Sequence, residues 1–271
     1  MKLSLLETAI LAAIKAGHKL MDFYQKSLEI SQKEDNSPIT EADIASNNII
    51  LSELSVTNLP ILSEEAIHTE YAKRSAWQRF WLVDPLDGTK EFIQRNGEFT
   101  VNIALIEQGK PVIGVIYSPV TGELYAGSPE TKSFKVKIAD NTLIEHSFQS
   151  LPIISDTSTL RIVVSRSHLD EQTIAFIKEL KKHYPETEVI TSGSSIKLCK
   201  VAEGSADGYP RFGKTMEWDT AAGHAILIYA EANLYEISTL KELRYNKPLL
   251  SNPEFIALRN DFVNKLAKHH V

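Results

Sequence analysis

Hydrophobic residues near the N-terminus recur at helical spacing. Five apolar residues between Leu3 and Ile14 fall three or four positions apart, which predicts an amphipathic first helix. A polar segment, SQKEDNSPITEAD, follows it, and a second helical pattern runs from Ile44 to Leu54. The chain therefore opens with two helices joined by a polar connection.

Strand-like patterns dominate the next hundred residues. The runs LPILSEE (59–65) and RFWLVD (79–84) are short, apolar and acidic at their ends. Residues 99–128 then alternate β-branched residues with the turn signals QGKP and PVTG, which predicts a meander of three antiparallel strands. Residues 130–155 are more polar and less periodic.

The last part of the chain alternates between the two periodicities. Strands are predicted at 161–167, 188–193, 206–212 and 232–237, with helices at 169–183, 195–203 and 218–231 between them. This alternation predicts an α/β layer in which helices pack on a sheet. We expect an N-terminal α+β domain over residues 1–155 and a C-terminal α/β domain over residues 156–271.

Composition narrows the classes of protein. The net charge of −6 argues against a nucleic-acid partner, which a basic surface would normally bind. The single cysteine, Cys199, cannot form an internal disulfide and is expected in the core. Glu7 and Lys15 interrupt the first apolar stretch, and no run approaches the roughly 18 residues of a membrane span. We expect a cytoplasmic protein, with peripheral association at the cytoplasmic face of the inner membrane left open.

Residues 208–215, GYPRFGKT, match the phosphate-binding pattern G-x-x-x-x-G-K-T. A working loop of this kind needs a helix that begins at the Lys-Thr pair, yet the helical pattern here starts only near Asp219. Pro210 also removes one backbone donor from the loop. We therefore interpret the match as chance agreement.

Carboxylates at the ends of predicted strands give a stronger signal. An acid beside a buried apolar run is costly unless it is paired, and hard cations such as Mg²⁺ prefer oxygen ligands. Loops that leave several strands can bring such ligands to one point. The candidates are Asp43, Glu64, Glu65, Asp84, Asp87 and Asp219.

The segment DPLDGT combines several of the required features. Asp84 ends a strand, and Asp87 follows three residues later, close enough to share a metal pair. Gly88 and Thr89 open a short helix, TKEFIQ, whose first N–H groups can bind a phosphate. A calcium EF-hand loop would need acids or amides at alternate positions, and the haloacid-dehalogenase pattern is D-x-D-G-T rather than D-x-x-D-G-T. The segment therefore indicates phosphoryl chemistry of another kind.

Together, LSEE, WLVDPLDGTKEFI and WDTAAGHA resemble the inositol monophosphatase superfamily of lithium-sensitive, magnesium-dependent phosphatases, over roughly residues 30–230. Within it, KEDNSPITEAD, DGTKEFI, SRSH (165–168), GSSIK (193–197) and YPRFG (209–213) resemble the 3′(2′),5′-bisphosphate nucleotidase branch. An inositol monophosphatase would be expected to show a DGTTNF-like helix start. The resemblance implies a layered α-β-α-β-α sandwich.

The same resemblance implies a set of site residues. It assigns catalysis to Asp43, Thr89 and Glu64, with Asp43 and Thr89 orienting and deprotonating the attacking water. It implies two Mg²⁺ ions, with a weaker third ion near Glu64 and Glu65. The implied ligands are Glu64, Asp84 and the Leu86 carbonyl for one ion, and Asp84, Asp87 and Asp219 for the second.

The substrate residues are less sharply defined. The N–H groups of Gly88 and Thr89 would hold the scissile phosphate, while Ser194, Lys197 and Arg211 would read a second phosphate and an adenine. Two alternatives stay open: Lys197 as a solvated helix face, and Ser194 as a helix cap only. His168 either contacts substrate or caps the following helix, and the cap is favoured. Trp218 is expected in core packing rather than as a platform for adenine.

The resemblance favours a phosphatase that removes the 3′-phosphate of 3′-phosphoadenosine 5′-phosphate, a by-product of sulfate activation, to give AMP. The alternative within the same chemistry is an inositol (poly)phosphate phosphatase. A non-catalytic nucleotide- or metal-binding protein is the alternative of another class. The complete acidic set with Thr89 argues against it, because a binder needs no residue that activates water.

Overall fold

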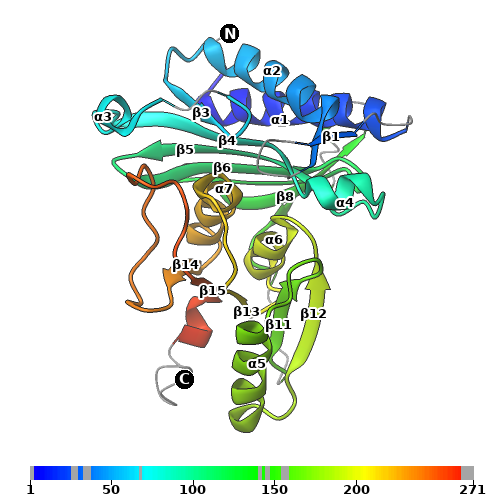
Figure 1. The fold of residues 1–271 in the computed structure, drawn as a ribbon, viewed down its shortest axis with the longest axis vertical. Coiled ribbons are helices and arrows are strands. Elements are labelled where there is room, and N and C mark those ends of the chain that lie inside the picture. The colour runs from blue at the N-terminus through cyan, green and yellow to red at the C-terminus, as the bar shows by residue number, and fades with distance from the viewer. Residues whose placement is uncertain are drawn as a thin grey trace.

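The structure is a computed structural model in which residues 3–25, 30–32, 38–66, 69–139, 142–143, 147–153 and 159–263 are described. Two sheets organise these residues, one of eight strands and one of five. Helices cover the outer face of each sheet and fill the space between them (Figure 1). The order of layers is helix, sheet, helix, sheet, helix, which confirms the fold class expected from the sequence.

The first layer consists of α1 (Leu5–Tyr24) and α2 (Glu41–Ser55), which lie side by side on the eight-stranded sheet (Figure 1). A capping box begins α1, because the Ser4 hydroxyl accepts from the Glu7 N–H and the Glu7 carboxylate accepts from the Ser4 N–H. A short antiparallel pair, β1 (Ile30–Gln32) and β2 (Pro38–Thr40), connects the two helices. The KEDNS part of the branch motif, residues 33–37, lies outside the described residues.

The eight-stranded sheet contains the predicted meander. Strand β3 pairs in parallel with β4, and the strands from β4 to β8 are antiparallel. In spatial order the strands are β10 (Gln149–Ser150), β8 (Lys132–Ala139), β7 (Glu123–Ser128), β6 (Lys110–Ser118), β5 (Thr100–Glu107), β4 (Arg79–Asp87) and β3 (Ile61–Ser63), with β9 (Thr142–Leu143) beside β8. The strand β8 lies in the polar, less periodic segment 130–155, for which the sequence patterns predicted no strand.

The remaining layers come from the second half of the chain. Between the sheets lie α6 (Ile196–Glu203) and α7 (Glu217–Ile228), and α5 (Glu171–His183) covers the far side of the second sheet (Figure 1). In spatial order that sheet has β12 (Glu188–Ser192), β11 (Arg161–Ser165), β13 (Gly208–Arg211), β15 (Phe255–Arg259) and β14 (Ala232–Glu236). The sequence patterns did not predict β15, nor the short helix α3 (Tyr71–Arg74).

The two halves share one core. Leu82 and Ala104 of the first sheet belong to the same buried cluster as Val163 and Phe255 of the second, with α6 and α7 between them. The expected domain boundary between residues 155 and 156 lies outside the described residues, so that division stays a prediction.

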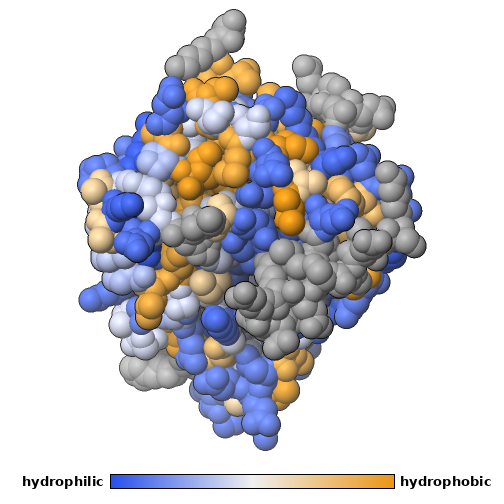
Figure 2. Space-filling model, turned by 45° about the horizontal axis from the view of Figure 1, so that its top comes forward, coloured by the Kyte–Doolittle hydropathy of each residue, from blue (hydrophilic) through white to orange (hydrophobic). Residues whose placement is uncertain are grey.

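The outer surface is mixed in character. Figure 2 shows hydrophobic and hydrophilic residues interleaved over the upper part of one face, and mostly hydrophilic residues at its narrow lower end. None of the described helices is both long enough and apolar enough to cross a membrane.

Candidate active site

Three of the predicted acids meet where two strands end and helix α7 begins. Because β3 and β4 are parallel, with Ser63 beside Val83, Glu64 emerges next to Asp84. The N-terminal turn of α7 brings Asp219 to the same point. One oxygen from each of Glu64, Asp84 and Asp219 lies within 4.8 Å of the others. They border a cavity of about 650 Å³ that Glu64, Asp87 and Asp219 help to line.

The acids raise one another's affinity for protons. Asp84 is only 2% exposed. Burial, and then the charges of Glu64 and Asp87, hold the pKa of Asp84 well above its usual range. Burial and the charge of Asp87 likewise raise the pKa of Asp219. Clustered carboxylates of this kind are hard oxygen donors and require a cation to be ionised together, so the donor set fits Mg²⁺.

Asp43 reaches this cluster from α2. Its carboxylate is buried and is one of the charges that raise the pKa of Asp84. Ser46, one turn further along α2, donates a hydrogen bond of 2.7 Å to the Pro85 carbonyl. This bond fixes α2 against the DPLDGT turn and so holds Asp43 near the acids.

Asp87 has a different environment from the other three. Its Oδ2 accepts a 2.6 Å hydrogen bond from the Ser195 N–H and a 3.3 Å bond from the Asn102 side chain. Asn102 also donates to the Ser195 hydroxyl at 2.9 Å. Asp87 therefore connects the end of β4 to the start of α6 while its charge acts on Asp84 and Asp219.

The other predicted residues of this wall lie close by. Thr89 lines the cavity and donates its hydroxyl to the Leu86 carbonyl at 3.4 Å. The Leu86 side chain is buried, so only its backbone can serve the site. Glu65 follows Glu64 but is not one of the three acids whose oxygens converge among the described residues. The ligand roles of all the predicted residues stay predictions: Glu64, Glu65, Asp84, Leu86, Asp87 and Asp219.

The same cavity is also lined by cations. Lys197 is only 6% exposed, so the alternative of a solvated helix face is wrong. Its ammonium donates to the Ser194 carbonyl and lies 5.4 Å from the centre of the Tyr209 ring. Burial lowers the pKa of Lys197 to about 8, although the charge of Asp87 opposes this effect.

Arg211 and Ser194 are the other predicted substrate residues. Both line the cavity, and Arg211 is buried. The Arg211 guanidinium donates to the His168 and Lys214 carbonyls, each at 3.3 Å, and its Nε has no partner among the described protein groups. Ser194 has a φ of +43°, which is uncommon for a residue with a side chain, and its hydroxyl accepts from the Ile196 N–H at 3.4 Å. Ser194 therefore faces the cavity in addition to bonding the helix start.

Two residues that line the cavity, Lys90 and His168, were not among the predicted site residues. His168 does not cap the following helix, because the Asp170 side chain does so by accepting from the Thr173 N–H at 2.7 Å. Instead, His168 lines the cavity and accepts a 3.1 Å hydrogen bond from the Lys90 ammonium. Desolvation, and then the charges of Lys90 and Arg211, lower the pKa of His168. Both residues lie in motifs that the sequence already singles out, Lys90 in DGTKEF and His168 in SRSH.

Residues 208–215, which match the P-loop pattern, do not form a P-loop. Gly208–Arg211 forms strand β13, paired antiparallel with β15, and α7 begins only at Glu217. Trp218 is buried in the core between the sheets, as expected.

Comparison with known proteins identifies the family. The model of the inositol monophosphatase family matches residues 1–241. The chain belongs to the inositol monophosphatase family. It is 45% identical over 236 residues to the 3′(2′),5′-bisphosphate nucleotidase CysQ of Salmonella typhimurium, covering 86% of this chain and 90% of that protein.

Solved structures of the family agree with this assignment. The crystal structure of CysQ from Bacteroides thetaiotaomicron matches with a TM-score of 0.86 and 45% identity, over 94% of this chain and 97% of that one. The extragenic suppressor protein suhB from Bartonella henselae matches with a TM-score of 0.74 and 25% identity, over 97% and 96% of the two chains. The family model stops before residues 242–263, the described segment that contains β15.

Proposed function

We propose that this family member is a magnesium-dependent 3′(2′),5′-bisphosphate nucleotidase that hydrolyses the 3′-phosphate of 3′-phosphoadenosine 5′-phosphate to AMP and phosphate. One observation carries the proposal: a single cavity is lined both by carboxylates suited to hard cations and by cationic side chains suited to a second phosphate. The Salmonella and Bacteroides relatives, at 45% identity, bear the CysQ name, which supports the nucleotide over an inositol phosphate as substrate.

The carboxylates that converge at the cavity would hold the metal. Glu64, Asp84 and Asp219 already converge within 4.8 Å. In the proposal Asp87 and the Leu86 carbonyl complete the ligands of two Mg²⁺ ions, and Glu65 lies near a weaker third. When bound, Mg²⁺ neutralises phosphoryl charge and makes water more acidic. Li⁺, another small hard cation, is expected to inhibit by competing for these oxygens.

The chain itself positions the reacting groups. Asp43 and Thr89 orient the attacking water, and the Asp43 carboxylate takes its proton. The Thr89 hydrogen is committed to the Leu86 carbonyl, which leaves the hydroxyl oxygen free to accept from water. Water attacks phosphorus directly and the ribose 3′-oxygen leaves, so no phospho-enzyme forms.

Gly88 shapes the phosphate contact. Its φ of +90° is a conformation that glycine adopts without strain, and a Cβ there would lie 3.1 Å from the Glu98 carbonyl. This turn presents the N–H groups of Gly88 and Thr89 at the start of α4 (Thr89–Ile93), where they hold the scissile phosphate.

The cationic side chains of the cavity bind the rest of the substrate. Lys197 supplies a point charge, and the guanidinium of Arg211 supplies a planar cation to the second phosphate. Ser194 adds a hydroxyl between them. We place the activity in the cytoplasm, where the buried thiol of Cys199 would stay reduced.

A substrate panel tests the proposal. Purified protein is assayed for phosphate release from 3′-phosphoadenosine 5′-phosphate, its sulfated form, AMP and inositol monophosphate, with and without Mg²⁺ and with added Li⁺. We expect Mg²⁺-dependent release from the adenosine bisphosphate and loss of release with Li⁺. Release from inositol monophosphate with none from the adenosine bisphosphate would overturn the proposed substrate. Unchanged turnover in Asp87→Asn would overturn the two-metal assignment.

A further inference from the structure

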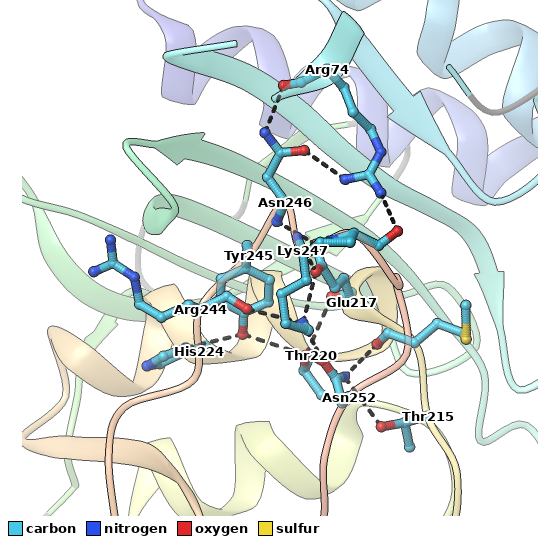
Figure 3. A network of polar contacts seen from close by, with 12 residues as sticks. Arg74, Thr215, Glu217, Thr220, His224, Arg244, Tyr245, Asn246, Lys247 and Asn252 are labelled. Carbon is cyan, nitrogen blue, oxygen red and sulfur yellow. Dashed lines mark hydrogen bonds and ion pairs between the residues drawn. The ribbon is translucent and has the colours of Figure 1, made fainter. Parts of the chain in front are cut away.

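Residues 244–252, a segment that we call the clasp, lie across the N-terminal turn of α7 (Figure 3). The contact begins with the backbone. The Glu217 N–H donates to the Leu250 carbonyl and the Asn252 N–H donates to the Thr215 carbonyl, each at 2.8 Å. A bridge between Met216 and Ser251 lies between these two bonds. The turn that carries Asp219 is thus held by a segment more than twenty-five residues later in the chain.

The side chain of Asn252 reaches further into the same turn (Figure 3). Its Nδ2 lies 2.6 Å from the Met216 carbonyl, 3.1 Å from the Thr220 hydroxyl and 3.2 Å from the Thr215 hydroxyl. One amide group therefore contacts residues on both sides of Asp219.

Met216 connects Asn252 to the carboxylate. Its N–H donates to Asp219 Oδ2 at 2.9 Å, and its carbonyl accepts both from Asn252 and from the Asp219 N–H at 3.2 Å. These bonds set the orientation of the carboxylate that converges with Glu64 and Asp84. Asn252 makes no direct contact with Asp219, so it can act only through this turn.

We propose that Asn252 is a positioning residue for Asp219, and that its side-chain amide sets the Mg²⁺ affinity of the acidic cluster. This inference rests on the proposed function, because it takes the cluster to be a Mg²⁺ site. Partners that orient a metal ligand from outside commonly change metal affinity when they are removed. Asn252 lies beyond residues 1–241, the span that the family model matches.

The clasp has an anchor that does not depend on the Asn252 side chain. Glu217 is fully buried, and its carboxylate accepts from the Asn246 N–H at 2.6 Å, the Lys247 N–H at 2.9 Å and the Lys247 ammonium at 2.7 Å. With the backbone bonds of residues 250–252, this anchor should keep the clasp in place when only the amide is changed. The Lys247 ammonium, 3.4 Å from Asn252 Oδ1, would also stabilise a carboxylate there.

Asn246 provides a matched control in the same segment. Its side chain accepts from the Arg74 guanidinium and donates to the Arg74 carbonyl, both at 2.8 Å, and hydrogen-bonds none of residues 215–220; only its backbone N–H contacts Glu217. Asn252→Asp and Asn246→Asp thus make the same chemical change, in one side chain that hydrogen-bonds the α7 turn and in one that does not.

Mg²⁺ titration by calorimetry, without substrate, tests the inference, with thermal melting in EDTA as a measure of the fold. We expect Asn252→Asp to raise the Mg²⁺ dissociation constant about tenfold or more, and Asn246→Asp to change it less than about twofold. Asn252→Ala, which removes the amide without adding a charge, should behave like Asn252→Asp.

Mg²⁺ affinity within about twofold of wild type in both Asn252 variants, whatever their melting temperatures, would overturn the inference. So would an equal loss of affinity in Asn246→Asp, because the effect would then be one of general stability. A wild-type protein that binds Mg²⁺ but does not hydrolyse the adenosine bisphosphate would overturn the proposed substrate and leave this inference standing. A wild-type protein that binds no Mg²⁺ would overturn both.

Discussion

Replacing Asp84 by asparagine should inactivate the protein and, in the absence of metal, stabilise it. Asp84 is buried among acids, and burial and the charges of Glu64 and Asp87 raise its pKa in the folded state. A raised folded-state pKa contributes stability that is present at low pH and is lost as the pH rises through that pKa. At neutral and alkaline pH the metal-free fold therefore carries the repulsion, and asparagine, of the same size but uncharged, removes it.

The distances give the size of the effect. Two charges 4.8 Å apart repel by about 3 kcal/mol at an effective dielectric constant of 20. Asp84 faces two such neighbours, Glu64 and Asp219, but partial protonation relieves part of the repulsion. We expect a net gain of about 2–3 kcal/mol for Asp84→Asn in EDTA, which corresponds to a rise in Tm of roughly 5–10 °C.

Thermal denaturation followed by circular dichroism measures this shift, in EDTA and in saturating Mg²⁺, at about pH 5 and pH 8. The advantage of Asp84→Asn should be largest in EDTA at the higher pH and should shrink in acid. Phosphate release should fall at least about a hundredfold. Glu65→Gln, a neighbouring change outside the convergent acids, is the control for the melts in EDTA, where no ion is bound near Glu65. A melting temperature of Asp84→Asn equal to or below that of wild type in EDTA at about pH 8 would refute the reasoning.

Three further predictions use other parts of the structure. Because the pKa of Lys197 is lowered to about 8, KM for the bisphosphate should rise as the pH passes 8 and the ammonium loses its charge. Lys197→Met should have a high KM that does not rise in this pH range. If KM of Lys197→Met rose with pH as it does in wild type, the role of Lys197 would be contradicted. Cys199 is 1% exposed and burial raises its pKa, so thiol reagents should label it only after unfolding; equal labelling rates in the native protein would be contrary evidence. A Cβ at Gly114 would lie 2.1 Å from the Ala222 carbonyl of α7, so Gly114→Ala should cost about 1–3 kcal/mol in denaturant unfolding, and a neutral result would show that α7 can move.

The features predicted from sequence share one property, which is that neighbouring residues determine them. The first helix follows from the spacing of its apolar residues, and the structure gives α1 over Leu5–Tyr24 with a capping box at Ser4. The acids of LSEE and DPLDGT directly follow buried strands, so their convergence follows from the parallel pairing of β3 and β4. The family motifs are local in the same sense.

The features that sequence missed depend on contacts between distant residues or on weak patterns. Strand β15, FIALR, is buried at four of its five positions, and a short apolar run of this kind has no readable periodicity. Strand β8 does alternate, with Phe134, Val136 and Ile138 buried, but its lysines made the segment look polar. No local pattern could connect Asn252 to Asp219, because the contact exists only once the clasp crosses α7.

The presence of both carboxylates and cations in the lining of one cavity argues for catalysis over binding. A protein that only bound a bisphosphate would need Lys197 and Arg211 and would gain nothing from carboxylates facing the same ligand, because they repel it. Here Glu64, Asp87 and Asp219 line the same cavity as those cations. That arrangement costs the metal-free protein both stability and affinity for anions, and it becomes favourable only when a divalent cation neutralises the acids. Mg²⁺ should therefore lower KM for the bisphosphate as well as permit turnover. A ligand that places no phosphate beside these carboxylates should bind without needing Mg²⁺.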